Sequence, residues 1–151
     1  MMAQTHLAFG LLFALILAPV LHASNNWLFF SIVLFCALLP DIDHPQSKIG
    51  RKIFVSKIFN LLFGHRGFFH AIWIPLALGL IVGAWLGFVY GIAIVIGYVS
   101  HLFSDGLTKS GINMIHPINQ LRMQGFVETG GIIEWLVFVL IAGINAILLL
   151  A

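Results

Sequence analysis

Long apolar stretches with almost no charge inside them are the feature that most constrains how this chain can fold. They run over residues 7–21, 27–39, 68–103 and 131–151. In the whole chain 61% of the residues are hydrophobic and 8% are charged, whereas an average soluble domain has about 25% charged residues. A water-soluble fold of this size would lack the polar surface to cover itself. The sequence therefore predicts an all-α, polytopic membrane helical bundle that forms one integral membrane domain over residues 1–151.

The third apolar stretch is too long for one membrane crossing. At 1.5 Å per residue it would make a helix of roughly 54 Å, against a hydrocarbon core of about 30 Å. We therefore expect two helices there, separated near residues 83–85, and about five short transmembrane helices in all. The first two stretches are shorter than the ~20 residues usual for a span, and a locally thin bilayer would accommodate them. The basic segment that begins at Lys48 predicts an additional interfacial helix that reaches to about Phe63.

The first apolar stretch could also belong to a secretory signal peptide, because the small residues Ala23 and Ser24 follow it. A signal peptide carries basic residues before its apolar region. Residues 1–6 contain no Lys or Arg. We therefore expect a retained first helix.

Basic residues indicate the orientation of the predicted helices in the membrane. All of them fall in the two segments, 41–67 and 105–130, that the helix count places on one side: Lys48, Arg51, Lys52, Lys57, Arg66, Lys109 and Arg122. The positive-inside rule makes that side cytoplasmic, in a multi-pass protein of the inner (plasma) membrane whose N-terminus is cytoplasmic and whose C-terminus is outside. The formal net charge of +2 argues against nucleic acid as a partner and leaves membrane lipids as the expected surroundings. No feature of the sequence determines an oligomeric state.

Potential metal ligands gather on the same side, although the helix count made no use of them. They are His6, Asp41, Asp43, His44, His65, His70, His101 and Asp105. The single cysteine, Cys36, lies inside an apolar run, so a Cys-type zinc site cannot be built within the chain. Any metal would be held by nitrogen and oxygen atoms.

The motifs that carry these residues differ in specificity. His101 and Asp105 are four residues apart, so in a helix both side chains project from one face; the simpler interpretation is a helix-end histidine with a hydrogen-bonded carboxylate. Asp41, Asp43 and His44 lie in a turn between two prolines, where one aspartate could bind metal and the other orient a histidine. An acidic surface turn that ends a helix is the alternative.

Two more histidine positions complete the cluster. In Gly64-His65-Arg66-Gly67-Phe68-Phe69-His70 the glycines let the backbone double back, so both imidazoles could face one centre. Alternatively, His65 is an interfacial polar residue and His70 a helix cap. His6, at the head of the first helix, is the least specific of the set and could mark the membrane boundary.

The mixed set of imidazoles and carboxylates predicts a divalent metal, with Zn first and Mn or Fe as alternatives, because Ca and Mg prefer shells of oxygen alone. The set exceeds the three protein ligands typical of one catalytic zinc, so one or two ions are expected. Such a centre activates water and binds a phosphoryl or acyl oxygen.

Glu134 and Arg66 are further candidates for catalysis, together with Asp43. Glu134 lies early in the last helix, where it could be a metal ligand or general base, or could simply be stabilised by the positive end of the helix. Arg66 or Arg51 could bind a substrate phosphate through its guanidinium group. The positive-inside rule, which places basic residues on the cytoplasmic side of the membrane, explains these charges equally well.

Several short motifs together resemble a known family. They are MMAQTHLAFG, LLPDIDHPQSKIGRK, GHRGFFHA, GYVSHLFSDGLT and TGGIIE. Their order and spacing over His6 to Glu134 are similar to those of the membrane-bound metal-dependent hydrolases of bacteria and archaea (DUF457-type), which include a LexA-regulated inner-membrane member. The resemblance implies an inner-membrane protein with hydrolase activity. Phe69 and Ala71 depart from the hydroxyl residues expected in HRGxTHS, which removes a supporting role for hydroxyls there.

Two functions follow as expectations. The first is a metal-dependent hydrolase that cleaves a phosphoester or related bond of an amphiphilic, lipid-like substrate at the cytoplasmic face. The second is a non-catalytic metal-binding membrane protein, with a sensor or structural site. An ion carrier would place ionisable groups near the middle of several helices. The predicted helices have none there, which disfavours this function.

Overall fold

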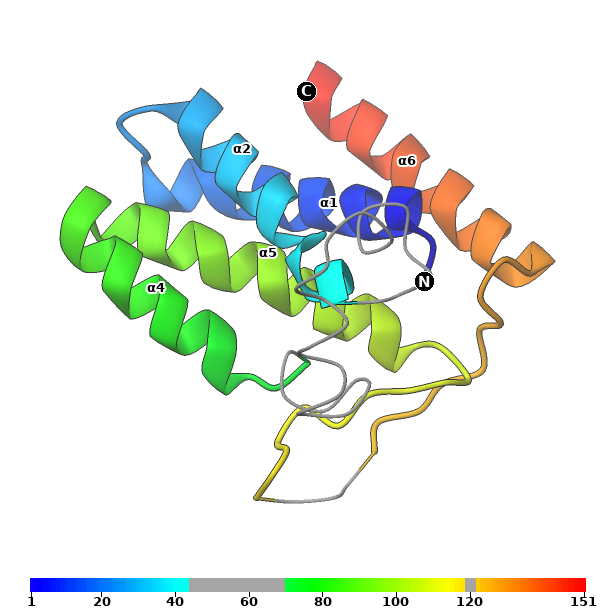
Figure 1. The fold of residues 1–151 in the computed structure, drawn as a ribbon. Coiled ribbons are helices and arrows are strands. Elements are labelled where there is room, and N and C mark those ends of the chain that lie inside the picture. Colours follow the sequence, from blue (N-terminus) through cyan, green and yellow to red (C-terminus); the bar gives the residue numbers. More distant parts are fainter. Residues whose placement is uncertain (44–69, 119–121) are drawn as a thin grey trace.

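The computed structural model describes residues 1–43, 70–118 and 122–151. The helices of these ranges are α1 (Ala3–Leu21), α2 (Asn26–Cys36), the 3-10 helix η1 (Leu39–Asp43), α4 (Trp73–Leu86), α5 (Phe88–Gly106) and α6 (Ile132–Leu150) (Figure 1). Within the described ranges the only extended pairing consists of two isolated β-bridges, Thr108 with Val127 and Ile112 with Met123. The prediction of an all-helical protein is confirmed for these ranges.

The number of helices of spanning length differs from the prediction. Three helices, α1, α5 and α6, are long and apolar enough to cross a membrane. The other two, α2 with 11 residues and α4 with 14, are shorter. The expected count of about five spans is therefore corrected to three spanning helices and two shorter apolar ones in the described part of the chain. Apolar runs overestimate helix length here, because the chain leaves the α-helix after Cys36 and α4 starts only at Trp73. The predicted interfacial helix lies outside the described residues.

Gly87 separates α4 from α5, slightly later than the predicted break at residues 83–85. Its φ of 107° lies in a region that glycine adopts readily and other residues rarely do. The amide of Gly87 still donates to Gly83 O at 3.1 Å, and the amide of Tyr90 donates to Gly87 O at 3.0 Å. One residue therefore ends one helix and begins the next.

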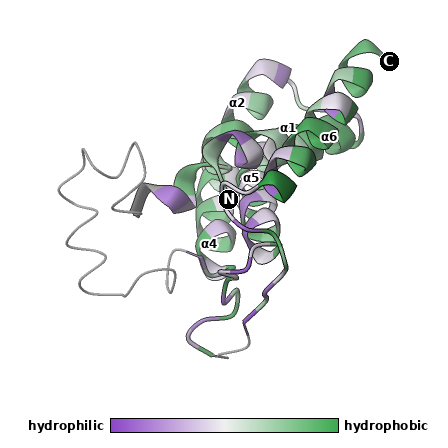
Figure 2. Ribbon diagram, turned by 90° about the vertical axis from the view of Figure 1, so that its right-hand side faces the viewer, coloured by the Kyte–Doolittle hydropathy of each residue, from purple (hydrophilic) through white to green (hydrophobic). Residues whose placement is uncertain are grey.

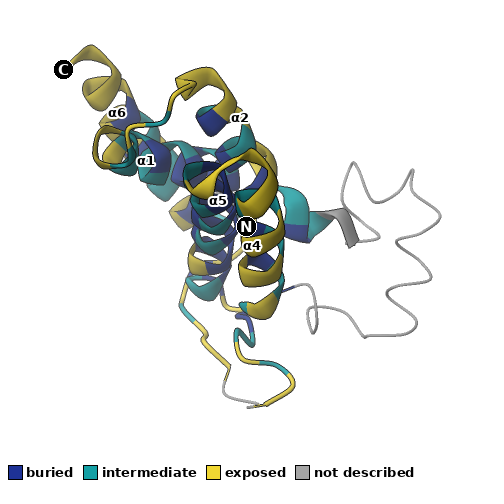
Figure 3. Cartoon of the chain, turned by 90° about the vertical axis from the view of Figure 1, so that its left-hand side faces the viewer, coloured by how far each residue is buried: buried dark blue, intermediate teal, exposed yellow. Residues whose placement is uncertain are grey.

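Helix α5 is the centre of the bundle (Figure 3). It packs against α4, α2 and α1, and α6 packs on α1. Of the apolar window of α5, 67% is buried inside the protein, against 17% for α6. Large apolar side chains such as Leu136 and Leu140 are exposed on α6, and the helices are coloured mainly as hydrophobic in Figure 2. Because water would not favour so much exposed apolar surface, this face suits lipid.

Gly97 allows α5 and α2 to approach closely near the end that carries the histidines. A Cβ atom at Gly97 would lie only 2.2 Å from Val33 O and 2.8 Å from Cys36 Cβ. Small residues at helix contacts in membranes permit this kind of packing. The contact brings the last turn of α2, and the backbone that follows it, against the part of α5 that leads to His101.

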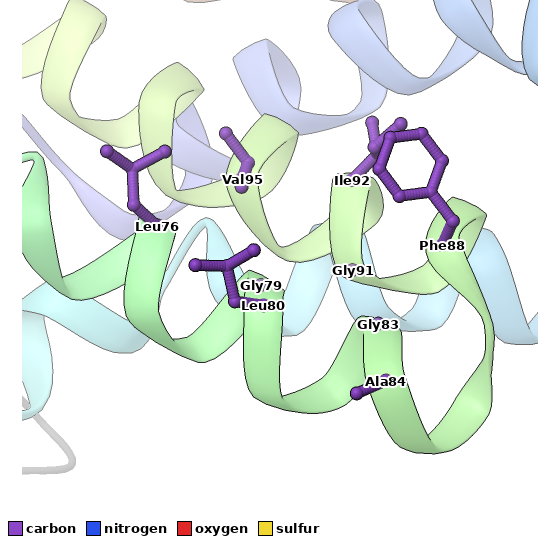
Figure 4. A pocket seen from close by; sticks show the side chains of 9 residues that line it. All are labelled: Leu76, Gly79, Leu80, Gly83, Ala84, Phe88, Gly91, Ile92 and Val95. Atoms are coloured by element: carbon purple, nitrogen blue, oxygen red, sulfur yellow. The ribbon is translucent and has the colours of Figure 1, made fainter.

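An apolar pocket of about 420 Å³ lies between α4 and α5 (Figure 4). Its lining includes three glycines and the side chains of Leu76, Leu80, Ala84, Phe88, Ile92 and Val95. No charged group lines it, so it suits a hydrocarbon group.

Candidate metal centre

Four side chains from three elements converge at one end of the bundle. His6 comes from the first turns of α1, Asp41 from η1, and His101 and Asp105 from the last turns of α5. One ligand atom from each lies within 4.8 Å of the others. The structure thus brings together four of the predicted metal ligands, although His6 and Asp105 lie about two thirds of the chain apart in sequence.

The nitrogen–oxygen distances within this cluster are similar to, or slightly longer than, those between the ligands of a single ion. His6 Nε2 lies 3.7 Å from Asp41 Oδ2 and 3.4 Å from Asp105 Oδ1. His101 Nε2 lies 3.9 Å from Asp41 Oδ1 and 3.7 Å from Asp105 Oδ2. Ligand atoms that bind one tetrahedral ion at about 2.0–2.2 Å are roughly 3.3–3.6 Å apart. The donor set therefore needs little adjustment to hold a cation.

Two nitrogen atoms of the cluster are buried without a hydrogen-bond partner among the described residues. They are Nε2 of His6 and Nε2 of His101, and both side chains are fully buried. A buried polar atom left unsatisfied costs about 1–3 kcal/mol, and such groups commonly serve a function. A cation between these nitrogens and the two carboxylates would satisfy all four groups.

The other ring nitrogens hold the imidazoles in place. His101 Nδ1 lies 2.8 Å from Ala37 O, just after α2, and His6 Nδ1 lies 2.7 Å from Ser104 Oγ on α5. Neither partner was predicted from the sequence. A backbone carbonyl has no sequence signature, but a hydroxyl residue beside Asp105 in a largely apolar helix was a usable signal.

Exposure is uneven around the centre. The side chains of His6 and His101 are fully buried, and that of Asp105 is 3% exposed. The Asp41 side chain is 25% exposed. Asp41 is therefore the most solvent-exposed of the four ligands.

His70, which was predicted to be a metal ligand, lies beside the cluster and is not one of its four members. Its Nε2 is 3.7 Å from Asp105 Oδ2, and its ring meets the His101 ring edge to face with centroids 5.5 Å apart. It is 3% exposed. It can orient Asp105 or extend the ligand set.

Glu134 is fully buried, but its carboxylate is already occupied by backbone donors. Oε1 accepts from the Met2 amide and Oε2 from the Gly130 amide, both at 2.6 Å. These bonds fasten the chain before α1 to the loop before α6. The N-terminal ammonium of Met1 in turn donates to Asp105. Glu134 is thus connected to the cluster only indirectly, through Met2 and Met1. A direct catalytic role for Glu134 stays a prediction.

Three predicted site residues, His44, His65 and Arg66, lie outside the described residues. The same holds for the side chain of Asp43 and for Phe69. Their roles stay predictions from the sequence.

Taken together, the fold and the site define a helical membrane protein with a buried cluster of histidines and aspartates that could bind a metal ion. The model of the family described as "YdjM inner membrane protein" matches residues 1–150, so the chain belongs to this inner-membrane family. This agrees with the membrane family that the motifs indicated.

Individual relatives are similar over most of the chain. The inner membrane protein YdjM of Escherichia coli K12 is 34% identical over 131 residues, which cover 78% of this chain and 66% of that protein, and the match to YdjM of Shigella flexneri has the same values. The uncharacterized protein YvsG of Bacillus subtilis is 38% identical over 104 residues, 67% of this chain and 65% of that protein. The aligned region thus spans slightly less than two thirds of these relatives. No solved structure matches the chain.

Proposed function

We propose that this protein is a membrane-embedded metal-dependent hydrolase whose centre consists of His6, Asp41, His101 and Asp105. The observation that carries the proposal is the convergence, within 4.8 Å, of two carboxylates and two buried imidazole nitrogens that have no hydrogen-bond partner among the described residues. Two nitrogen and two oxygen donors suit Zn, Mn or Fe better than Ca or Mg. Zn is the first candidate, and the compact donor set favours one ion.

Each residue of the proposed site then has a role in the reaction. When bound, a divalent ion supplies Lewis-acid chemistry, polarising a phosphoryl or acyl oxygen and making water a better nucleophile. His6, His101 and Asp105 hold their ligand atoms in a water-excluded position. Asp41, the most exposed of the four, faces the side from which water and substrate arrive. From the sequence, Arg66 is the candidate for contacting a phosphate, and Asp43 and Glu134 are the candidates for transferring protons.

An amphiphilic substrate fits the position of the centre. The ligands lie at the ends of apolar helices, so a head group could reach the centre while its tail stays in lipid. The apolar pocket lies on α4 and α5, and α5 also carries His101 and Asp105. Its volume of about 420 Å³ is in the usual range for ligand pockets. We therefore propose a lipid-like phosphoester or related compound as the substrate.

Metal analysis of purified variants tests the proposal. Wild type should retain stoichiometric metal, whereas His101→Ala and Asp41→Ala should lose it. His22→Ala is the control, because His22 is an exposed residue that follows the other end of α1. Each sample is then assayed on a phosphoester, a lipid pyrophosphate and an acyl ester. Equal metal in all four proteins would refute the centre, and a metal-loaded wild type that cleaves none of the substrates would refute the hydrolase.

A structural or sensory metal site is the second candidate, and the deep burial of three of the four ligands favours it. Structural zinc sites are closed, whereas catalytic ones keep a position open to water or substrate. Cobalt-substituted protein separates the two candidates. An added anion such as azide should change the visible spectrum of an open centre and leave that of a closed one unchanged.

A further inference from the structure

The Ser104 hydroxyl links the two histidines of the centre. Its Oγ donates to the backbone carbonyl of His101 at 2.9 Å and lies 2.7 Å from His6 Nδ1. Both contacts are hydrogen bonds at the same time only when the single hydroxyl proton goes to His101 O, because a carbonyl oxygen can only accept. Ser104 Oγ must then accept, and the proton of the second hydrogen bond belongs to His6 Nδ1.

This direction determines the tautomer of His6. A neutral imidazole that carries its proton on Nδ1 has its lone pair on Nε2. Nε2 is the His6 atom that faces Asp41 and Asp105. His101 is held in the same tautomer, because its Nδ1 donates to the carbonyl of Ala37. Of the two tautomers, only that of His6 depends on a side chain.

We propose that Ser104 is a positioning residue that fixes the Nδ1-protonated tautomer of His6 and so prepares Nε2 to bind a divalent cation. The inference rests on the proposed metal centre. Serine in a helix often donates to a carbonyl of its own preceding turn, and that bond alone would be a local structural feature. The second bond, to a fully buried histidine 98 residues away in sequence, is what gives Ser104 a role in the site.

Ser100 provides a matched control on the same helix. It is also fully buried, and its Oγ donates to Gly97 O at 2.7 Å with the same sequence spacing. Its hydrogen bond to Gly97 O involves no histidine. Ser100→Ala therefore removes an equivalent hydroxyl without touching His6, and Ser104→Thr keeps the hydroxyl at the position itself.

The first readout is the tautomer in metal-free protein. Full-length chain labelled with ¹⁵N-histidine in micelles gives long-range ¹H–¹⁵N correlations that distinguish protonated from unprotonated ring nitrogens, and a His6→Gln variant identifies the His6 signals. Wild type, Ser100→Ala and Ser104→Thr should show His6 protonated on Nδ1. Ser104→Ala should show a mixture of tautomers. An unchanged His6 spectrum in Ser104→Ala, or the same change in Ser100→Ala, would overturn the inference.

The second readout is the affinity for Zn²⁺ in the same four proteins. Loss of a group that orients a ligating histidine typically weakens metal binding about 10- to 100-fold, and Ser104→Ala should fall in that range. Ser100→Ala and Ser104→Thr should stay within about threefold of wild type. A tautomer change without a change in affinity would also overturn the inference. Absence of Zn²⁺ binding in wild type would instead refute the proposed function. The tautomer measurement would still stand, because it is made on metal-free protein.

Discussion

The imidazole rings of His6 and His101 stack almost parallel, with their centroids 3.8 Å apart and an angle of 13° between their planes. One ring stands near the start of α1 and the other near the end of α5. The stacking directs both Nε2 atoms toward the same pair of carboxylates, those of Asp41 and Asp105. The packing of α1 against α5 thus determines where the ligand atoms of the site lie. Changes to this packing or to the ligands should have measurable effects.

His70→Ala should weaken metal binding without abolishing it. His70 contacts Asp105 but is not one of the four converging ligands, so its loss should lower the affinity for Zn²⁺ about 10- to 100-fold, as loss of an orienting group does. The stoichiometry at saturating Zn²⁺ should stay that of wild type. Isothermal titration measures both quantities. A halved stoichiometry would show instead that His70 belongs to a second ion.

Glu134→Gln should reduce stability more than metal content. An amide has only one acceptor oxygen, so one of the two backbone donors, Met2 or Gly130, loses its partner, at a cost of about 1–3 kcal/mol in the free energy of unfolding. Unfolding in mixed micelles measures the change, with the exposed Glu128→Gln as control. If Glu134→Gln stays fully stable and metal-loaded yet inactive, Glu134 acts as the general base predicted from the sequence.

Gly97→Ala should destabilise the protein and disturb the centre together. The new methyl group would meet Val33 O and Cys36 Cβ, so α2 must shift, and Ala37 O would move away from His101 Nδ1. Overpacking of this kind costs about 1–3 kcal/mol, and Zn²⁺ affinity should fall with it. Gly143→Ala on α6 is the control, because nothing lies within 4 Å of its added atom. Unfolding and metal titration of both variants test the link, and equal behaviour of the two would contradict it.

Ala84→Trp should fill the apolar pocket and raise KM for a substrate with a long tail. Ala84 is an exposed residue of the pocket wall, far along α4 from the centre, so metal content should not change. A short, water-soluble phosphoester should be cleaved at the wild-type rate. Leu140→Trp, on the exposed face of α6, controls for added bulk in lipid. If KM is unchanged for substrates of every tail length, the substrate tail does not bind in this pocket.

Cysteine labelling in intact cells should show the orientation. Starting from Cys36→Ala, a cysteine at exposed Arg122 should react with a membrane-impermeant maleimide only after the membrane is opened, because the positive-inside rule places its segment in the cytoplasm. A cysteine at exposed Asn26 should react from outside. The reverse pattern would put the metal centre on the outer side.

The sequence predicted those parts of the site that depend on local geometry or on helix order. The spacing of His101 and Asp105 required only a helix, and the approach of His6 and Asp41 required only that consecutive helices alternate in direction. The hydrogen bonds that orient the rings were not predictable, because the carbonyl of Ala37 looks like any other in sequence. The end of α2 at Cys36 and the start of α4 at Trp73 were not predicted, because the apolar stretches of the sequence continue across both positions.

The origin of the ligands in α1, η1 and α5 has a consequence for assembly. A chain that is still inserting cannot form the centre until α5 has packed against α1 and α2, so the proposed ion would bind the finished bundle and not its parts. An ion at a hundred times its Kd would stabilise that bundle by about 2.7 kcal/mol. Binding of the proposed ion would therefore protect the assembled bundle against unfolding, independently of its effect on any reaction.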